Sequence, residues 1–459
     1  MSNYSRTVRY EVDAECITPL RTGASVRDTE TVLQERSGRL LLQGSSLAGA
    51  MRDWLCHNGL SEEAKELFGS EEQGAGCLMV STALFDTDAT VDIRPRVAIN
   101  RKTGVVDGAT KFDMAHINAG AHFHFSLIWL GTAETEASHK AVIVQLLSAL
   151  HSGAIRLGGQ KSNGFGRVSL QVWSRDFDLT DPTDRDDWVN IGWDLWSENK
   201  KLDLSAWKLQ PLELPETAQS QVIFTVNATF PQLIIKSGSS VFVGHSRYDE
   251  QLHENGRALI PGSSIKGVVL SRLRIIASAL GVQPSIINDA FGRGPEYSAE
   301  LGKRDKGMPG LFRFDDAYPE VSKASRINRI RINRVTGGTV NSALFCQEPI
   351  AGSLTLHISG PAAQDTGRKK TSLERTNSPK QHGQICALML YSLRDLALGI
   401  YNLGSGWAVG RGTLQVTSIT AQEGDRRLTM TFDAAHRAAL EDPDGLAAEW
   451  IQQLGGNSK

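Results

Sequence analysis

The sequence predicts an α+β protein built from two copies of one domain that follow each other along the chain. Two repeated motifs support this. Residues 40–49 (LLLQGSSLAG) return as residues 258–267 (ALIPGSSIKG), and residues 94–104 (RPRVAINRKTG) return as residues 329–337 (RIRINRVTG). Strand and helix patterns surround these motifs in the same order in both halves, as a duplicated domain requires.

Each half opens with a strand. Apolar and polar residues alternate in residues 6–16 and again in residues 221–229, which is typical of a half-buried strand. A loop follows, and the Gly-Ser-Ser motif comes next. We therefore expect equivalent first strands at the start of the two copies.

The Gly-Ser-Ser motif predicts a strand, a tight turn and a helix. In the second copy an apolar run (258–260) indicates a short buried strand, and Pro261 and Gly262 end it. Ser263 and Ser264 then stand where a helix N-cap is expected. The N–H groups and the positive end of the helix dipole would favour an anion there, although simple capping of the helix explains the same residues.

The remaining predicted elements again keep one order: a strand after a Phe-Gly pair, an irregular basic segment, an alternating strand, a helix, and a Gly-rich turn before a last strand. Their positions are 77–86, 94–113, 117–126, 141–155 and 157–168 in the first half, and 310–316, 329–346, 350–357, 384–401 and 403–414 in the second.

The order β–α–β–(basic segment)–β–α–β predicts two tandem ferredoxin-like (RRM-like) domains with insertions. We place the first domain at residues 1–173 and the second at 217–424. The Asp- and Trp-rich residues 174–216 are interpreted as an ordered connector. Residues 425–459 form a C-terminal extension with one strand and one helix, the latter over 443–454.

The composition is that of an ordinary globular protein, with 459 residues and a net charge of −2. A nucleic-acid surface would therefore depend on local clusters of cations. The five cysteines show no CxxC spacing, so we expect reduced thiols, a cytoplasmic location and no zinc site. No apolar run is long enough for a membrane span. Neither Gly-rich turn follows a P-loop or dinucleotide-binding pattern, so no nucleotide cofactor is expected.

The basic segments and the Gly-rich turns are candidate contacts for phosphate groups. Arginines alternate with apolar residues in 94–102 and 326–334, which predicts strands with one cationic and one buried face. The glycines would let a phosphate approach the backbone. A solvated strand face and a hairpin that needs positive φ angles are the structural alternatives.

The repeated set of motifs, IPGSSIKG, RxRINRxTG and LGG…GFGR, resembles the RAMP superfamily of CRISPR-associated proteins. Within it, the chain is most similar to backbone subunits of type III effector complexes (Csm/Cmr backbone subunits), as a tandem fusion of two such subunits in type III-D-like systems. The resemblance covers nearly the whole chain except the connector and the C-terminal extension.

The resemblance implies a guide-RNA-binding subunit. It implies as partners the CRISPR guide RNA, complementary target RNA, a large polymerase-like subunit, a small subunit and other RAMP subunits, with no membrane. The basic segments would form thumb-like hairpins, from which Phe112, Met114 and Phe345 could wedge between bases. The RNA-binding residues it suggests are Gly44, Ser45, Ser46, Arg52, Gly262, Ser263, Ser264, Lys266, Arg96, Arg101, Lys102, Arg329, Arg331, Arg334, Gly159, Lys161, Arg167 and Arg411.

The resemblance also implies a catalytic aspartate with a divalent metal, Mg²⁺, in the loop between the first strand and the Gly-Ser-Ser motif. Asp249 matches this position best in the second half, with Glu250 as the second choice, while Asp28 and Glu30 are both candidates in the first. Such an enzyme would cleave target RNA by using the RNA's own 2′-OH as nucleophile. Solvated loop carboxylates are the structural alternative.

Three other functions remain open. A non-catalytic backbone would only bind and display guide RNA. A guide-processing endonuclease would need a histidine near a Gly-rich turn, and neither turn contains one. A generic RRM-like RNA binder would need aromatic pairs on its central strands, and none is evident.

Overall fold

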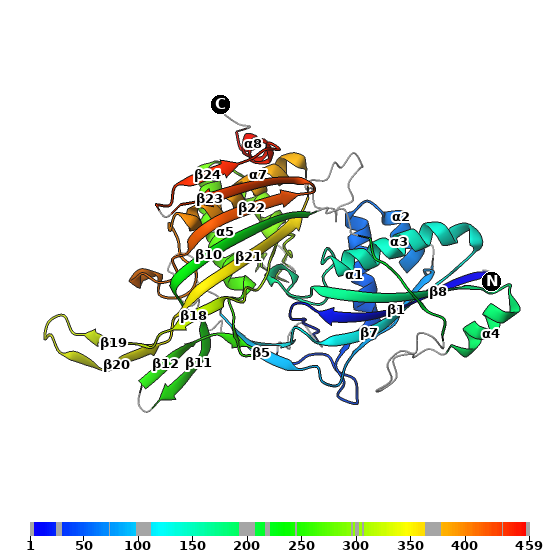
Figure 1. Ribbon diagram of the computed structural model, residues 1–459, viewed down its shortest axis with the longest axis horizontal. Coiled ribbons are helices and arrows are strands. Elements are labelled where there is room, and N and C mark those ends of the chain that lie inside the picture. Colours follow the sequence, from blue (N-terminus) through cyan, green and yellow to red (C-terminus); the bar gives the residue numbers. More distant parts are fainter. Residues whose placement is uncertain are drawn as a thin grey trace. The chain divides into compact units, whose positions relative to one another are not determined.

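The computed structural model describes residues 4–23, 30–72, 74–97, 112–191, 207–215, 221–243, 246–294, 297–298, 303–304, 307–362, 378–433 and 435–455. The chain forms two compact units. Unit 1 comprises residues 1–94, 113–161 and 165–217, and unit 2 comprises residues 95–112, 162–164 and 218–459. Each unit combines an antiparallel sheet with helices (Figure 1).

The sheet of unit 1 has the strand order of a ferredoxin-like fold. Its core strands lie in the order β4-β7-β1-β8, and all the pairs between them are antiparallel. The elements of the first half are β1 (Arg6–Cys16), β2 (Leu41–Leu42), α1 (Gly44–His57), α2 (Ser61–Phe68), β3 (Leu78–Val80), β4 (Ala83–Phe85), β5 (Val91–Arg96), β6 (Phe112–Ile117), β7 (His122–Gly131), α3 (Ala133–His151), η1 (Lys161–Asn163), β8 (Val168–Asp178), α4 (Pro182–Asn190) and β9 (Gln210–Pro211).

The sheet of unit 2 repeats this order as β17-β21-β10-β22, extended by β23 and β24. Its elements are β10 (Gln221–Leu233), β11 (Lys236–Val243), β12 (Ser246–Gln251), β13 (His253–Glu254), β14 (Arg257–Ala258), α5 (Gly262–Ala279), α6 (Pro284–Phe291), β15 (Tyr297–Ser298), β16 (Lys303–Arg304), β17 (Arg313–Phe314), β18 (Glu320–Ala324), β19 (Ile327–Ile332), β20 (Thr339–Gln347), β21 (Ile350–Pro361), α7 (Pro379–Ala397), η2 (Trp407–Val409), β22 (Gln415–Glu423), β23 (Arg426–Phe432), β24 (Ala438–Glu441) and α8 (Leu446–Gln452). The predicted α+β class with two tandem ferredoxin-like domains is therefore confirmed.

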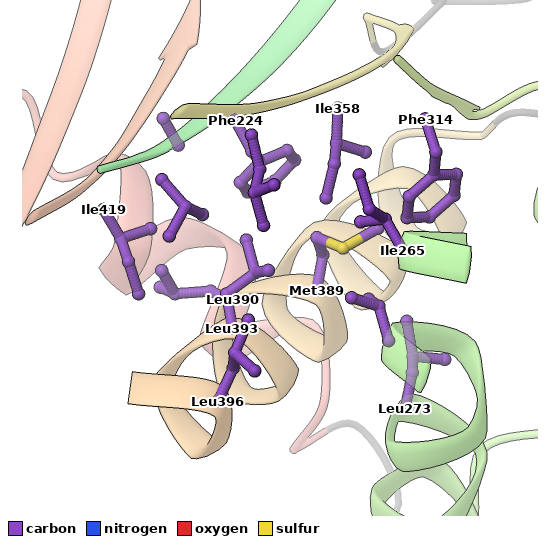
Figure 2. Close-up of a cluster of buried hydrophobic side chains, with 14 of the residues drawn as sticks. Phe224, Ile265, Leu273, Phe314, Ile358, Met389, Leu390, Leu393, Leu396 and Ile419 are labelled. Carbon is purple, nitrogen blue, oxygen red and sulfur yellow. The ribbon is translucent and has the colours of Figure 1, made fainter. Parts of the chain in front are cut away.

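The core of each unit lies between its sheet and two long helices. In unit 1, Leu47, Met51 and Leu55 are fully buried on one face of α1, since residues four apart share a helix face. In unit 2, Leu273 of α5 and Leu393 of α7 join the cluster beneath the sheet in Figure 2. This packing explains why a 3.6-residue apolar period in the sequence located these helices.

The predicted strands after the Phe-Gly pairs are shorter than expected. Residues 77–86 form two short strands, β3 and β4, and residues 310–316 contain only β17. Both stretches run past the start of the Gly-Ser-Ser helix, where a carbonyl oxygen packs against the first helical residue. The chain there follows the helix instead of keeping a long regular ladder.

The connector and the C-terminal extension both carry ordered elements. Phe177, Ile191 and Leu209 form a small apolar cluster that gathers Trp188 and Trp207 around α4. The C-terminal extension adds β23 and β24 to the sheet of unit 2. Its helix α8 buries Trp450 in the core of that unit. Among the described residues, no helix is both long and apolar enough to cross a membrane.

The greatest departure from expectation is an additional sheet in unit 2. Strands β11, β12, β20 and β19 form a four-stranded sheet in that order, and β12 pairs in parallel with β20. The segment before the Gly-Ser-Ser helix was predicted to be a loop, but residues 246–251 form strand β12. They do so because the second basic segment supplies a partner strand from a distant part of the chain.

Candidate nucleic-acid interface and active site

Both Gly-Ser-Ser motifs form the first turn of a helix. Helix α1 begins at Gly44 and α5 begins at Gly262, and neither N-cap residue caps the helix through its side chain. The N-cap of α5 is Pro261, so the prediction that Ser263 or Ser264 stands at the N-cap is wrong. Proline is suited to this place because its fixed, extended conformation (φ −62°, ψ 139°) directs the chain into the helix.

The glycine of each motif is required by packing. A Cβ atom on Gly44 would lie 2.4 Å from the carbonyl oxygen of Val80, and one on Gly262 would lie 1.9 Å from that of Phe314. Both separations are far below van der Waals distance and involve backbone, which cannot easily move aside. Only glycine lets the neighbouring segment pass the helix start this closely.

The serines of the motifs and one cation on each helix, all of them predicted RNA contacts, differ in exposure between the units. Ser45, Ser46 and Arg52 are exposed on α1, whereas Ser263, Ser264 and Lys266 are half-buried on α5. The helix start of unit 1 is therefore the more accessible of the two to a ligand from solvent.

A carboxylate already occupies part of the α5 start. The backbone N–H of Gly262 donates to Asp316 Oδ1 at 2.7 Å, an arrangement that the helix dipole favours. Lys266 Nζ donates to Ser162 Oγ at 3.2 Å, and both residues belong to unit 2. An RNA phosphate at this helix start would therefore compete with the Asp316 carboxylate for the N–H of Gly262.

The two Gly-rich turns have the same backbone geometry. The N–H of Leu157 donates to Gly166 O at 2.9 Å, and the N–H of Leu403 donates to Gly412 O at 2.9 Å. Gly166 and Gly412 have φ angles of 85° and 76°, values that favour glycine. The structural alternative, a turn that needs positive φ angles, therefore accounts for these two glycines.

A hollow of about 510 Å³ in unit 1 brings two predicted segments together. Ser46 of α1 and Gly159 and Lys161 of the Gly-rich turn line it, next to Gly23 at the start of the loop after β1. Lys161 and the exposed Ser46 hydroxyl give this hollow donors for an anionic ligand, while the Asp53 carboxylate also lines it. Arg167, the last predicted cation of this turn, is exposed but does not line the hollow.

Asp249 lies at the centre of a polar cluster in unit 2. Its Oδ2 forms an ion pair with Lys236 Nζ at 2.9 Å and accepts a hydrogen bond from Gln347 Nε2 at 3.1 Å. Gln347 Oε1 in turn accepts hydrogen bonds from the guanidinium groups of Arg411 and Arg329. We call these five residues the Asp249 cluster.

The Asp249 cluster unites three segments that the sequence had singled out separately. Asp249 comes from the segment before the Gly-Ser-Ser helix, Arg329 comes from the second basic segment, and Arg411 comes from the Gly-rich turn. Gln347, which joins them, ends strand β20 directly after the basic segment. The parallel pairing of β12 with β20 places Asp249 directly beside Gln347. The four-stranded sheet therefore places the predicted acid near Arg329, and Gln347 links this sheet to Arg411 of the Gly-rich turn.

Burial shapes the electrostatics of the Asp249 cluster. Asp249 and Arg411 are buried, with exposures of 8% and 4%, while Arg329 is exposed. Burial, and next the positive charge of Arg329, lower the pKa of Arg411 from its ordinary value. Arg411 nevertheless keeps its charge at neutral pH, because guanidinium pKa values are far above it.

Gln347 and Lys236 were not predicted as site residues. Gln347 is an uncharged residue at the end of a strand, and Lys236 follows the first strand of the second half without any motif around it. Only their contacts with Asp249 reveal their role. No sequence pattern could have found them, since each acts across a tertiary contact.

Glu30 takes the place of Asp249 in the fold of unit 1. The N–H of Leu41 donates to Leu33 O at 3.1 Å, just as the N–H of Leu259 donates to Leu252 O at 2.8 Å. Leu33 and Leu252 therefore correspond. Glu30 and Asp249 precede these leucines by the same number of residues. The alternative residue, Asp28, lies outside the described residues.

The surroundings of Glu30 differ from those of Asp249. Leu20 pairs with Ile117 in unit 1 as Leu233 pairs with Ile350 in unit 2. By this register and that of the Gly-rich turns, Met114 stands in the place of Gln347 and Phe165 in that of Arg411. Both are buried. Unit 1 thus has apolar side chains where unit 2 has the glutamine–arginine pair.

The basic strands do not have the predicted buried faces. In β19, Ile330 and Ile332 are 54% and 55% exposed, and the arginines beside them are exposed too. The reason is that no layer within the described part of the chain covers this hairpin. In β5 the pattern is reversed: Ile93 is exposed, and Arg94 is buried with its guanidinium 4.8 Å from the centre of the Phe165 ring. An arginine over an aromatic face is favourable when shielded from water.

The remaining predicted residues are placed as follows. Arg331 and Arg334 are exposed on the β19–β20 hairpin, and Arg96 is half-buried on β5. Arg101 and Lys102 lie outside the described residues. Of the suggested wedge residues, Phe112 and Phe345 are each 43% exposed, whereas Met114 is buried and cannot insert between bases.

A comparison with known families agrees with this geometry. The sequence model of a family described as the RAMP superfamily matches residues 13–169 and 234–415, once in each half and over most of the chain. No curated protein matches the chain. Each matched region includes one Gly-Ser-Ser helix, one basic segment and one Gly-rich turn. The chain therefore belongs to the RAMP superfamily, which includes the backbone subunits of type III CRISPR complexes.

Proposed function

We propose that the protein is a double backbone subunit of a type III CRISPR effector complex. It binds guide RNA along both units and cleaves guide-paired target RNA at the Asp249 cluster. Its partners are the guide RNA, the complementary target RNA and other subunits of the complex. The observation that carries the proposal is the meeting of Asp249, Arg329 and Arg411 through Gln347.

The Asp249 cluster suits a reaction at a phosphodiester. Arg329 is exposed and cationic, so it can bind an RNA phosphate. Gln347 holds it in place by accepting a hydrogen bond from it, and the same Gln347 oxygen accepts one from the buried Arg411. Cleavage by the 2′-OH of RNA requires the attacking oxygen and the leaving oxygen to be in line with phosphorus. Side chains fixed by a buried network are suited to hold one linkage in that geometry.

The residues fit a divalent metal only when it is shared with RNA. Among the described residues no group of three or more His, Cys, Asp or Glu side chains could hold a metal ion. Mg²⁺ commonly binds through one or two carboxylates together with phosphates of the substrate. Asp249 supplies such a carboxylate. A bound metal would stabilise the negative charge that develops on the reacting phosphate.

Lys236 adds a condition to this mechanism. Its ammonium group lies 2.9 Å from the Asp249 carboxylate, where a metal would otherwise bind. The lysine side chain is 41% exposed and flexible, so an approaching phosphate can attract it away from Asp249. The carboxylate then becomes a ligand or a proton acceptor only when RNA is present.

The test is target cleavage by the assembled complex. Labelled complementary RNA is incubated with the complex and Mg²⁺, and fragments are counted for the native subunit and for Asp249→Asn. We expect the variant to lose one set of fragments and to bind target RNA with unchanged affinity. Addition of EDTA is expected to stop cleavage by the native complex.

Glu250→Gln is the matched control. Glu250 is the next residue on β12, and neighbouring residues in a strand point to opposite faces, so its substitution leaves the Asp249 cluster intact. Fragments should remain unchanged in this variant. An unchanged fragment pattern in Asp249→Asn would exclude the catalytic assignment.

A non-catalytic backbone is the second candidate, and one observation favours it. Asp249 is buried and already neutralised by Lys236, which is also how a purely structural carboxylate would look. In a non-catalytic backbone, the Asp249 cluster would only hold the β19–β20 hairpin against the Gly-rich turn. The cleavage experiment above separates the two candidate functions. If Asp249 is only structural, Asp249→Asn destabilises the subunit but removes no set of fragments.

A further inference from the structure

A second hollow, of about 490 Å³, lies in unit 2 beside helices α5 and α6. Lys266 and Arg274 line it from α5, and Arg293 lines it just after α6. All three cations are half-buried, and no Asp or Glu is among the described residues that line the hollow. We call it the α5–α6 hollow. Of the three cations, only Lys266 belongs to one of the repeated motifs.

The local structure explains why the three cations converge. Lys266, Leu270 and Arg274 are spaced four residues apart, so they share one face of α5. Leu270 is buried and anchors this face to the core, while the two cations beside it border the hollow. Arg293 is held opposite by backbone hydrogen bonds with Met308, with an N···O distance of 2.9 Å in each direction.

The α5–α6 hollow has no cationic counterpart in unit 1. Since α1 begins at Gly44 and α5 at Gly262, Ala48 corresponds to Lys266 and Cys56 to Arg274. The bridge between Ser70 and Gly74 corresponds to that between Arg293 and Met308, so Ser70 takes the place of Arg293. Unit 2 therefore has three cations at positions where unit 1 has an alanine, a cysteine and a serine.

We propose that the α5–α6 hollow binds a backbone phosphate of single-stranded RNA. Three converging cations without a lining carboxylate attract an anion, and the arginines can bind phosphate oxygens in a forked geometry. The Lys266 end of the hollow adjoins the Gly-Ser-Ser helix start, so the same strand can pass both. The proposal rests on the proposed function, because that function supplies the RNA.

The test uses the full chain and a labelled single-stranded RNA, with binding measured by fluorescence anisotropy over a series of salt concentrations. The double variant Arg274→Gln/Arg293→Gln leaves Lys266 and the Gly-Ser-Ser motif intact. We expect it to bind about tenfold or more weakly, because it cannot form charge-assisted hydrogen bonds to phosphate at these positions. The slope of log affinity against log salt should fall by about 0.7 for each phosphate that the variant no longer neutralises.

Arg427→Gln is the matched control, since it removes an exposed cation from β23, which does not line the hollow. It should bind RNA like the native protein, and thermal unfolding should show that all variants are folded. If the double variant keeps native affinity and slope, the hollow is not an RNA site, although the proposed function stands. If the native protein itself fails to bind RNA, both proposals fall.

A competition arm distinguishes the source of the phosphate. ATP and inorganic phosphate are titrated separately into the native protein and the double variant, and binding is followed by calorimetry. We expect ATP and inorganic phosphate each to bind weakly, without saturation over the concentration range in which RNA binds. Saturable ATP binding that disappears in the double variant, together with unchanged RNA binding, would assign the hollow to a free nucleotide and overturn the proposal.

Discussion

At the scale of single residues, two glycines of α5 show how position decides the role of one residue type. A Cβ on Gly262 would lie 1.9 Å from a backbone oxygen, whereas one on Gly267 would meet nothing within 4 Å. We predict that Gly262→Ala destabilises the protein by about 1–3 kcal/mol through overpacking. Gly267→Ala should stabilise it by about 0.5–1 kcal/mol, because alanine favours the helix. Urea unfolding measures both, and equal effects would refute the packing argument.

The buried pair Gln347–Arg411 offers a second test at the residue scale. Gln347→Met leaves the buried Arg411 without the acceptor that it has now, and should cost about 1–3 kcal/mol. The double variant Gln347→Met/Arg411→Phe introduces the residue types that unit 1 has at these places, and should recover most of that loss. Chemical unfolding of Gln347→Met, Arg411→Phe and the double variant gives the coupling free energy between the two side chains. Additive losses would show that the two side chains act independently.

At the scale of elements, the β19–β20 hairpin exposes apolar side chains that contribute little to stability. Ile330 and Ile332 are more than half exposed and Val335 is 93% exposed. We predict that Ile330→Ser/Ile332→Ser changes the free energy of unfolding by no more than about 0.5 kcal/mol for each substitution. The same variant should weaken the binding of guide-paired target RNA, because apolar side chains can pack against bases that are pulled apart.

The control for the hairpin is Val321→Ser on β18, another exposed aliphatic residue of unit 2 that lies outside the hairpin. Target binding should be unaffected by it. A hairpin variant that is as stable as the native protein and binds target RNA equally well would show that this face does not contact RNA.

At the scale of the whole molecule, the duplicated domains have diverged at the place of the proposed chemistry. Glu30 corresponds to Asp249, but Met114 and Phe165 replace Gln347 and Arg411. Without the glutamine and arginine, unit 1 has no equivalent network among its described residues to position a phosphate. The two halves therefore share one fold and differ in the part that we expect to act on RNA.

This divergence predicts one cut for each copy of the subunit. In the assembled complex, Glu30→Gln should leave the target fragments unchanged, whereas Asp249→Asn should remove one set. Gel analysis of labelled target RNA distinguishes the two variants. Loss of a second, separate set of fragments in Glu30→Gln would show instead that unit 1 is also active.

The sequence by itself determined the duplication, the α+β class and the order of elements. These follow from local patterns: a period of two in strands such as β1, a period of 3.6 in helices such as α1, and glycines that require special backbone angles. It also singled out Asp249, Arg329 and Arg411, each within its own segment.

Only the tertiary structure decided how those residues meet. Asp249 and Gln347 are separated by 98 residues in the chain, and the parallel pairing of β12 with β20 brings them together. No local period encodes such a pairing, because the stability of a strand that lacks its own apolar pattern comes from its neighbour. For the same reason the sequence could not show that Ile330 is exposed and Arg94 buried, since that depends on which layer covers each strand.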